Sequence, residues 1–369
     1  MIEDLFIINE GGQLLYSWHN KKTGEEQNED DLVSGFLTAL NNFASAERGE
    51  DIKSLKLRKT SIIFEKCEDF EQKLTFVSTT RNENLIELLH AIVHEIMNAF
   101  TEQYKEILNQ EFDGDVSRFE PFEENVNQIF LDYGLEQLED NIAKVEQDNN
   151  FKSVIYLESK GGNIYYIHAK QYVNKDKISF LVPLLVNSAK LLYKTNLNEN
   201  IYWILFNTVR NENLLIEIRK NILIAKQYQL EKNFEEEFLS LSFFESEGKY
   251  VKKPKKLVKR FENLKFDERI KQVFLVDMVG KILFSKIFDE SYDCAEYIPE
   301  TISFLTSSKK ASKEIYNRIL FNSSIGGENI GTVCVNFNNF ALILIGNIND
   351  FSSFIAIQEI TSDLYKQLI

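Results

Sequence analysis

Three segments of the chain share one pattern of apolar and polar positions. In each, an apolar run is followed by a polar residue three positions before a glycine, and then by a second apolar run with an aromatic side chain near its end. The segments span residues 5–20, 154–169 and 273–286, and their glycines are Gly12, Gly162 and Gly280. Because glycine adopts the positive φ that tight turns need, each segment is predicted to form a β-hairpin. The chain is therefore predicted to contain three copies of one module.

A helix is predicted after each hairpin. In the first copy, the apolar residues from 32 to 44, Phe36 among them, recur with a period of about 3.6 residues and predict one buried stripe. In the second and third copies, Pro183 and Pro299 are expected near the start of the helix, where the missing N–H of proline leaves no hydrogen bond unmade. We therefore expect these two helices near 183–195 and 299–310.

Further strands and a closing helix are predicted in every copy. The strands are expected at 60–67 and 73–79, at 201–208, 213–220 and 223–227, and at 318–323, 332–336 and 340–345. The closing helices are expected at 84–108, 232–246 and 351–368. The fold class is therefore predicted to be α/β, more closely α+β. Each module has the order β-β-α-β-β-β-α and forms a five-stranded antiparallel sheet with flanking helices.

The repeats divide the chain into three tandem domains. Module one covers residues 1–134, with an extra helix predicted at 115–130, module two covers 151–248 and module three covers 265–369. A basic linker is expected at 249–264, between modules two and three. The length of 369 residues agrees with two or three domains of ordinary size. Hydrophobic residues make up 44% of the chain and charged residues 27%, so each module can build a core.

The chain is acidic, with a net charge of −15 and a pI near 5.0. Nucleic acid is therefore not expected as a partner, because phosphate binding needs a basic surface. One segment, residues 249–260, carries seven positive charges and no acid. It is either a solvated linker or a contact site for an anionic membrane surface or an acidic partner. The contact residues would be Lys252, Lys253, Lys255, Lys256, Lys259 and Arg260.

The sequence offers little catalytic chemistry. His90 and His94 stand four residues apart, but they lack the glutamate of an HExxH zinc motif. The glycine-rich segment 323–332 lacks the lysine of a phosphate-binding loop and is predicted to be a hairpin turn. The three cysteines lack CxxC spacing. We therefore expect no enzymatic activity, no cofactor and no metal. No apolar run approaches the roughly 20 residues of a membrane span, so a cytoplasmic protein is expected, peripheral to a membrane if the basic segment binds one.

The first helix of module one has an uncharged surface. No residue from 32 to 46 is charged, and the face directed away from the sheet offers Ser34, Thr38 and Asn41. A helix exposed to water normally carries Lys and Glu there, whereas a protein-binding face benefits from small, uncharged residues. We therefore expect this helix to bind a partner. In module two, residues 178–193 carry one charge, and that helix either binds a partner or packs on its counterpart in module three.

The order of elements resembles that of the longin domains of membrane traffic. The resemblance rests on Gly12, residues 14–16, the helix at 30–46, the closing helix at 84–104 and the run at 114–130. Modules two and three are similar to shorter longin or roadblock domains, so the resemblance covers nearly the whole chain. Three such domains in one chain are similar to the tri-longin subunits of Rab guanine-nucleotide exchange factors.

The resemblance implies a non-enzymatic regulator or scaffold of a Ras-like small GTPase, such as an exchange-factor subunit that acts as a homodimer or with a second longin-type subunit. It implies a partner-binding surface on the first hairpin and first helix, at Asn9, Trp18, Ser34, Thr38, Asn41 and Asn42. Trp18 is either an exposed anchor or a cap on the core. Two alternative interpretations are a vesicle-tethering or adaptor subunit without exchange activity, and a small-molecule sensor similar to PAS and GAF domains.

Overall fold

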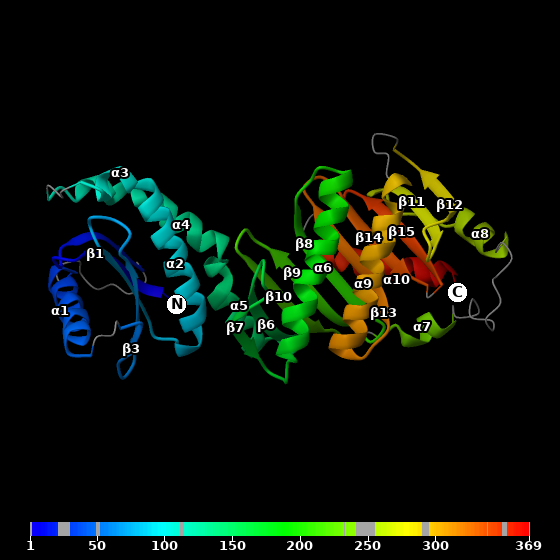
Figure 1. Cartoon of the computed structure of the whole chain (residues 1–369). Helices are drawn as coiled ribbons and strands as arrows, with labels where there is room; N and C mark the ends of the chain where they lie inside the picture. Colours follow the sequence, from blue (N-terminus) through cyan, green and yellow to red (C-terminus); the bar gives the residue numbers. More distant parts are fainter. Residues whose placement is uncertain are drawn as a thin grey trace. The chain divides into compact units, whose positions relative to one another are not determined.

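The computed structural model describes residues 2–20, 30–48, 52–110, 114–231, 233–240, 255–289, 295–337, 339–348 and 353–368. The chain divides into two compact units (Figure 1). Unit 1 comprises Met1–Ala143 with Tyr165–Ile167, and unit 2 comprises Lys144–Ile164 with His168–Ile369. The fold is mixed α/β with two antiparallel sheets, one of five and one of ten strands. At this level the predicted fold class is confirmed.

The sheet of unit 1 has the strand order β2-β1-β5-β4-β3, with antiparallel neighbours throughout. Its strands are β1 (Ile2–Asn9), β2 (Leu14–His19), β3 (Ser54–Lys56), β4 (Ser61–Cys67) and β5 (Leu74–Thr80). Gly12 has a φ of +84° in the turn between β1 and β2, which confirms the predicted hairpin. The strand β3 is not among the predicted strands, because three residues are too few to show a period-2 pattern.

Helices cover both faces of this sheet. They are α1 (Asp30–Arg48), α2 (Ile86–Gln103), α3 (Lys105–Leu108) and α4 (Glu123–Asp132), followed along the chain by α5 (Leu138–Gln147), with 3₁₀ turns at Glu83–Leu85, Ser117–Phe122 and Leu135–Gln137. On one face, Leu37 of α1 forms a core cluster with Phe6 and Val77. On the other face, the ring of Phe100 in α2 lies 5.9 Å from that of Phe76. Val77 and Phe76, which are neighbours in β5, therefore point to opposite faces of the sheet, as strand geometry requires.

The ten-stranded sheet of unit 2 joins the strands predicted for modules two and three. Its order is β12-β11-β15-β14-β13-β8-β9-β10-β6-β7. The strands are β6 (Phe151–Glu158), β7 (Ile164–Ala169), β8 (Ile201–Thr208), β9 (Glu212–Ile218), β10 (Ile222–Gln229), β11 (Ile270–Asp277), β12 (Ile282–Ile287), β13 (Leu320–Gly327), β14 (Gly331–Asn336) and β15 (Phe340–Gly346). Each five-stranded half repeats the order found in unit 1, and the halves meet where Asn207 of β8 pairs with Asn322 of β13. The prediction of one sheet per module therefore needs correction for modules two and three.

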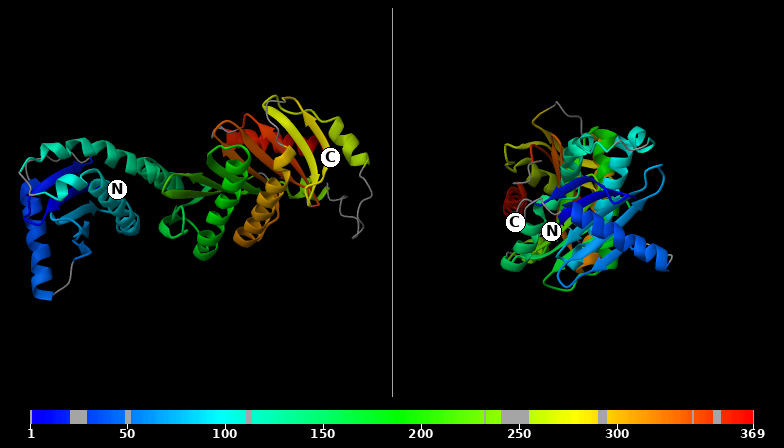
Figure 2. Two further views of the ribbon diagram at one scale, coloured as in Figure 1. Left: turned by 45° about the horizontal axis from the view of Figure 1, so that its top comes forward. Right: turned by 90° about the vertical axis from the view of Figure 1, so that its left-hand side faces the viewer.

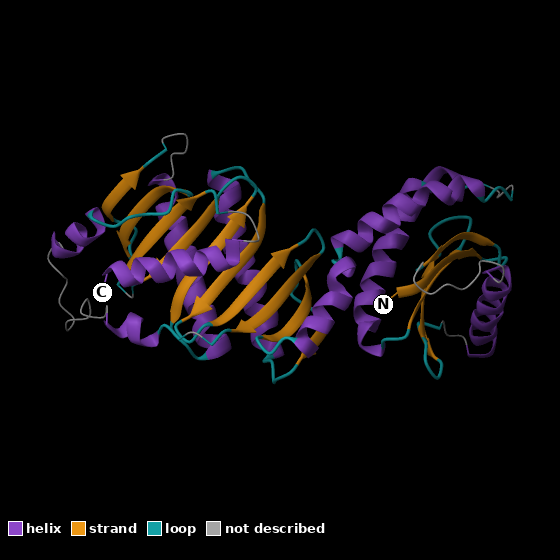
Figure 3. Ribbon diagram, turned by 180° about the vertical axis from the view of Figure 1, so that it is seen from behind, coloured by secondary structure: helices purple, strands orange, loops and turns teal. Residues whose placement is uncertain are grey.

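Two layers of helices enclose the ten-stranded sheet. The helices are α6 (Lys175–Asn196), α7 (Glu235–Ser240), α8 (Lys255–Glu262), α9 (Ile298–Tyr316) and α10 (Ser353–Leu368). Figures 1 and 2 show α6 and α9 side by side on one face, and Figure 3 shows α10 across the other. On the α10 face, Ile357 and Leu364 join a core cluster with Leu205 and Leu344. None of the helices in the described ranges is both long and apolar enough to cross a membrane.

The helix α6 begins earlier than predicted. The Asn174 side chain accepts a hydrogen bond at 3.1 Å from the backbone N–H three residues later and so caps the helix at its start. Pro183 therefore lies within α6, and the prediction that it marks the start is wrong. Proline cannot donate to the Ser179 carbonyl, and the preceding hairpin turn packs there, because a Cβ on Gly162 would lie 2.2 Å from that oxygen. Pro299 lies at the start of α9, as predicted.

The predicted linker at 249–264 contains the helix α8 and is anchored at its C-terminal end. Phe261 is 1% exposed, and its ring lies edge-on to Phe337 at 5.9 Å between centroids. Leu264 belongs to the same core cluster. The hydrophobic contacts of two side chains thus hold the end of this segment on unit 2, where a freely solvated linker was the simpler expectation.

Candidate partner-binding surface

Specific contacts hold the first hairpin of unit 1 against the start of α1. The Ser34 hydroxyl donates a hydrogen bond to the Gly12 carbonyl at 3.2 Å. A Cβ on Gly12 would lie 3.5 Å from the Thr38 side chain, so the turn and the helix are in close contact. The Asn9 side-chain oxygen accepts a hydrogen bond from the Gln13 N–H at 2.9 Å and closes the turn. These contacts fix the rotation of α1 over the hairpin.

Three of the residues predicted to bind a partner are engaged within unit 1. Ser34 is only 1% exposed, and the Asn9 side chain is used by the turn. Trp18 is partly buried, and its ring lies edge-on to Phe130 with 4.9 Å between centroids. Of the two interpretations of Trp18, the contact favours the cap on the core. The partner-binding role of these three residues stays a prediction.

The other three predicted residues lie further along α1. Thr38 is partly buried, Asn42 is exposed, and the side chain of Asn41 lies outside the described residues. The exposed residues of α1 within the described set are uncharged, and they are Gly35, Phe36, Ala39 and Asn42. The apolar pattern predicts Phe36 on the buried stripe, whereas the structure leaves it 62% exposed. Phe36 is thus the largest apolar side chain on this face that the sequence pattern assigned to the core.

Unit 2 contains a helix in the equivalent position. The Ser179 hydroxyl of α6 donates a hydrogen bond to the Gly162 carbonyl at 2.6 Å, as Ser34 does to Gly12. Both glycines have a positive φ in the turn of the preceding hairpin. The two serines are therefore structurally equivalent, and the residue two positions after each serine is Phe36 in α1 and Leu181 in α6. Leu181 is only 4% exposed.

The neighbouring helix α9 explains why that position is buried in unit 2. Lys177 of α6 forms an ion pair with Glu314 of α9 at 3.0 Å, and the hydroxyls of Ser188 and Ser307 lie 3.4 Å apart. Leu181 comes four residues after Lys177 and seven before Ser188, so it lies on the same side of the helix. This packing confirms the prediction that the first helices of modules two and three can cover each other. In the described part of unit 1, no second helix covers Phe36 in this way.

The helix α6 also presents an apolar stripe to solvent. Phe180, Leu184 and Leu191 are 65%, 41% and 62% exposed. Their spacing of four and seven residues places them on one side of the helix. Exposed apolar side chains in a contiguous row are typical of interaction surfaces.

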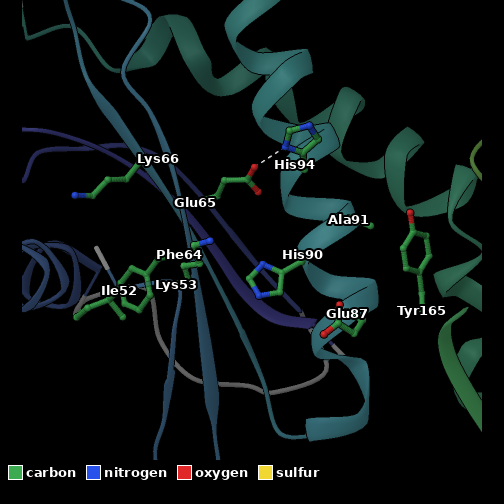
Figure 4. Close-up of a pocket in the computed structure, with 10 residues that line it drawn as sticks. All are labelled: Ile52, Lys53, Phe64, Glu65, Lys66, Glu87, His90, Ala91, His94 and Tyr165. Atoms are coloured by element: carbon green, nitrogen blue, oxygen red, sulfur yellow. Dashed lines mark hydrogen bonds and ion pairs between the residues drawn. The ribbon is translucent and has the colours of Figure 1, made fainter. Parts of the chain in front are cut away.

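A groove beside β4 contains both histidines of α2 (Figure 4). The His94 Nδ1 lies 2.5 Å from the Glu65 carboxylate, while His90 and Glu87 lie further along the same helix. Within the described ranges, no group of three or more His, Cys, Asp or Glu side chains is arranged to hold a metal ion. Of the two histidines, His94 contacts β4 through Glu65.

The basic residues of the predicted membrane or acidic-partner contact are only partly described. Lys259 on α8 is exposed. Lys252 and Lys253 lie outside the described residues, as do the side chains of Lys255, Lys256 and Arg260. Their role stays a prediction. The glycine-rich segment 323–332 contains the turn between β13 and β14, but its first five residues belong to β13.

The uncovered face of α1, centred on Phe36, is the clearest candidate surface that the chain offers. No protein-family model matches the sequence, and no curated protein matches it.

Proposed function

We propose that the chain is a non-enzymatic regulator or scaffold of Ras-like small GTPases in membrane traffic, and that unit 1 binds the GTPase with the exposed face of α1. The observation that carries the proposal is the 62% exposure of Phe36, at a position where the equivalent Leu181 of unit 2 is 4% exposed. Aromatic side chains are enriched at the centres of protein interfaces. Burying most of a phenylalanine side chain stabilises a complex by about 1.5–3 kcal/mol.

The residues around Phe36 suit close approach by a partner. Gly35 and Ala39 are small, and Asn42 is polar without a charge. A partner that docks here therefore has no charged group to desolvate on the described face of α1. We infer that the partner is a small GTPase from the similarity of the element order to that of longin domains. Exchange activity would need only a reshaping of the switch regions of the GTPase, with no bond made or broken by this chain.

The test is light scattering after gel filtration. The full chain is mixed with each small GTPase encoded in the same genome, prepared nucleotide-free, GDP-bound and GTP-bound. A complex with one of them is expected, and preference for the nucleotide-free form indicates exchange, whereas preference for the GTP form indicates an effector. Absence of a complex with every GTPase would refute the GTPase as the partner.

Point variants place the interface. Phe36→Arg should weaken the complex by at least about 30-fold, which corresponds to about 2 kcal/mol. Asn42→Arg should also weaken it, whereas Asn98→Arg, the same substitution at an exposed position on α2, should not. The midpoint of thermal unfolding should stay unchanged in all three, because each side chain is exposed. A complex that tolerates Phe36→Arg would show that the GTPase binds elsewhere on the chain.

A further inference from the structure

Among the described strands of unit 1, β3 lies at the edge of the sheet. Within the described residues, β3 pairs with β4 over three residue pairs and has no strand on its other side. The Phe64 N–H donates to the Lys53 carbonyl at 2.9 Å, and this bond fixes the alternation of hydrogen-bonding groups along β3. The backbone N–H and C=O groups of Ser54 and Lys56 consequently point away from β4. They are available to an additional strand.

In unit 2, the strands that occupy the position of β3 pair with each other within one chain. The strands at the corresponding place in the order are β8 and β13, which pair with each other and so complete the ten-stranded sheet. Each has eight residues, and neither contains a charged side chain. In both halves of unit 2, the strand edge that corresponds to β3 therefore binds a further antiparallel strand.

The charge of the β3 edge differs from that of β8 and β13. Residues 52–60 contain four cations and no acid, in a chain whose net charge is −15. The cations are exposed, and they are Lys53, Lys56, Arg58 and Lys59. One of them, Lys56, forms an ion pair with Glu83 at 2.7 Å. An acidic segment would therefore find more positive than negative charge along this edge.

A second copy of this chain is a poor occupant of the same edge. Pairing two copies of β3 about a twofold axis would bring their cations close to one another, and like charges opposite each other destabilise a strand pair. Short edge strands that carry lysine are also typical of edges that resist pairing with themselves. The charge pattern thus favours a different chain with acidic side chains.

We propose that the β3 edge of unit 1 binds an extended, acidic segment of a partner protein as an additional antiparallel strand. The outward backbone groups of Ser54 and Lys56 supply the main-chain hydrogen bonds, and the surrounding cations select acidic side chains. The groove beside β4, whose lining includes Ile52 and the cations Lys53 and Lys66, receives side chains of the same segment (Figure 4). The proposal concerns the edge of β3 and not the exposed face of α1, so it does not depend on the GTPase.

The test uses two synthetic heptapeptides with blocked ends and the same valine and threonine positions, EVTVEVE and KVTVKVK. Each is titrated into the full ¹⁵N-labelled chain, and amide chemical shifts are followed by transverse-relaxation-optimised spectroscopy. The acidic peptide should produce saturable shifts at Ser54, Lys56 and their neighbours, at an affinity at least about fivefold higher than that of the basic peptide. Phe36→Arg should leave this binding unchanged, which separates it from the proposed GTPase site.

Two variants and one control locate the binding. Ser54→Pro removes an outward N–H without breaking the pairing of β3 with β4, a position where strands tolerate proline, and it should weaken the acidic peptide at least about tenfold. Lys53→Glu should weaken it as well, whereas Lys105→Glu, an exposed charge reversal on α3, should not. Equal affinity for both peptides, or binding that survives Ser54→Pro, would overturn the proposal. So would a dimer of the free chain that Ser54→Pro dissociates, because a second copy would then occupy the edge.

Discussion

The junction of β8 and β13 should be sensitive to one added methyl group. Gly326 of β13 is paired with Trp203 of β8, and a Cβ on Gly326 would lie 2.1 Å from the Cε2 and Nε1 atoms of the indole. Trp203 is only 3% exposed and belongs to the core cluster that contains Leu205 and Phe234. The ring therefore has little room to move. Gly326→Ala should destabilise unit 2 at the place where its two halves meet.

The size of the effect follows from the overlap. Non-bonded carbon atoms prefer separations of about 3.5–4.0 Å, so either the indole or the β13 backbone must shift by more than about 1 Å. Overpacking a core in this way typically costs about 1–3 kcal/mol, and the burial of Trp203 puts the expected cost of Gly326→Ala near the upper end. Gly35→Ala is the matched control, because Gly35 lies in α1 and a Cβ there would have no atom within 4 Å. Alanine in a helix should stabilise unit 1 by about 0.5–1 kcal/mol.

Urea unfolding of the full chain can separate the two effects. The chain has two tryptophans, Trp18 in unit 1 and Trp203 in unit 2. In a Trp18→Phe background, tryptophan fluorescence reports unit 2, and Gly326→Ala should lower the midpoint of that transition. Gly35→Ala should leave it unchanged and should raise the midpoint of unit 1, measured in a Trp203→Phe background.

A double-mutant cycle identifies the physical cause. Trp203→Phe removes the ring atoms nearest the added methyl group, so the cost of Gly326→Ala should fall in that background. Calorimetry of the four chains should give a favourable coupling energy of at least about 1 kcal/mol. A cost of Gly326→Ala below about 0.5 kcal/mol, or additive effects without coupling, would refute the steric argument.

Three further predictions concern buried polar groups and the basic segment. Neither Nδ2 nor Oδ1 of Asn207 has a hydrogen-bond partner among the described residues, so Asn207→Leu should raise the free energy of unfolding of unit 2 by about 1 kcal/mol in urea titrations; a loss would show that the amide is needed. Burial lowers the pKa of Lys309 to about 8, which disfavours its protonated form in the folded state. The stability of unit 2 relative to Lys309→Met should therefore rise as the pH increases from 8 toward 10, and a flat difference would contradict the shift. If the basic segment contacts membranes, changing Lys252, Lys253, Lys255 and Lys256 to glutamate should abolish flotation with anionic liposomes, and equal flotation would remove the membrane role.

Local signals account for the part of the fold that the sequence predicts well. The bounds predicted for β8, residues 201–208, agree with the structure. The turns at Gly12, Gly162 and Gly280 were recognisable because a positive φ favours glycine. The joining of β8 to β13 has no comparable signal, because strands far apart in the chain carry no mark of which edge they will meet. The start of α6 was misplaced for a related reason, since Pro183 can sit inside a helix when tertiary packing compensates for the lost hydrogen bond.

The candidate surface was predicted as a region but not by its residues. The absence of charge drew attention to the first helix as a region. The period of about 3.6 residues, however, cannot separate Phe36 from its neighbour Leu37, which is 3% exposed. Ser34 was expected to face a partner because it is small and polar, but its hydroxyl is used by the Gly12 carbonyl. The equivalence of Ser34 with Ser179 was hidden because the two serines stand 22 and 17 positions after their glycines, and it becomes visible only through the two hydrogen bonds.

The edge strand β3 is flanked by positive charges, whereas β8 and β13 are uncharged. This difference follows from whether the pairing strand belongs to another protein or to the same chain. Two strands in one chain meet at a high effective concentration, so β8 and β13 can pair without charges to select each other. Their uncharged side chains can then be buried in a continuous sheet without the cost of desolvating a charge. If an edge strand binds a strand of another protein, pairing with the same strand of a second copy of the chain must be disfavoured. The lysines around β3 disfavour such self-pairing, because they repel the lysines of an identical edge and attract acidic side chains. On this argument, removing the charge with Lys53→Ser and Lys56→Ser should do more than weaken an acidic partner: it should allow the chain to pair with itself.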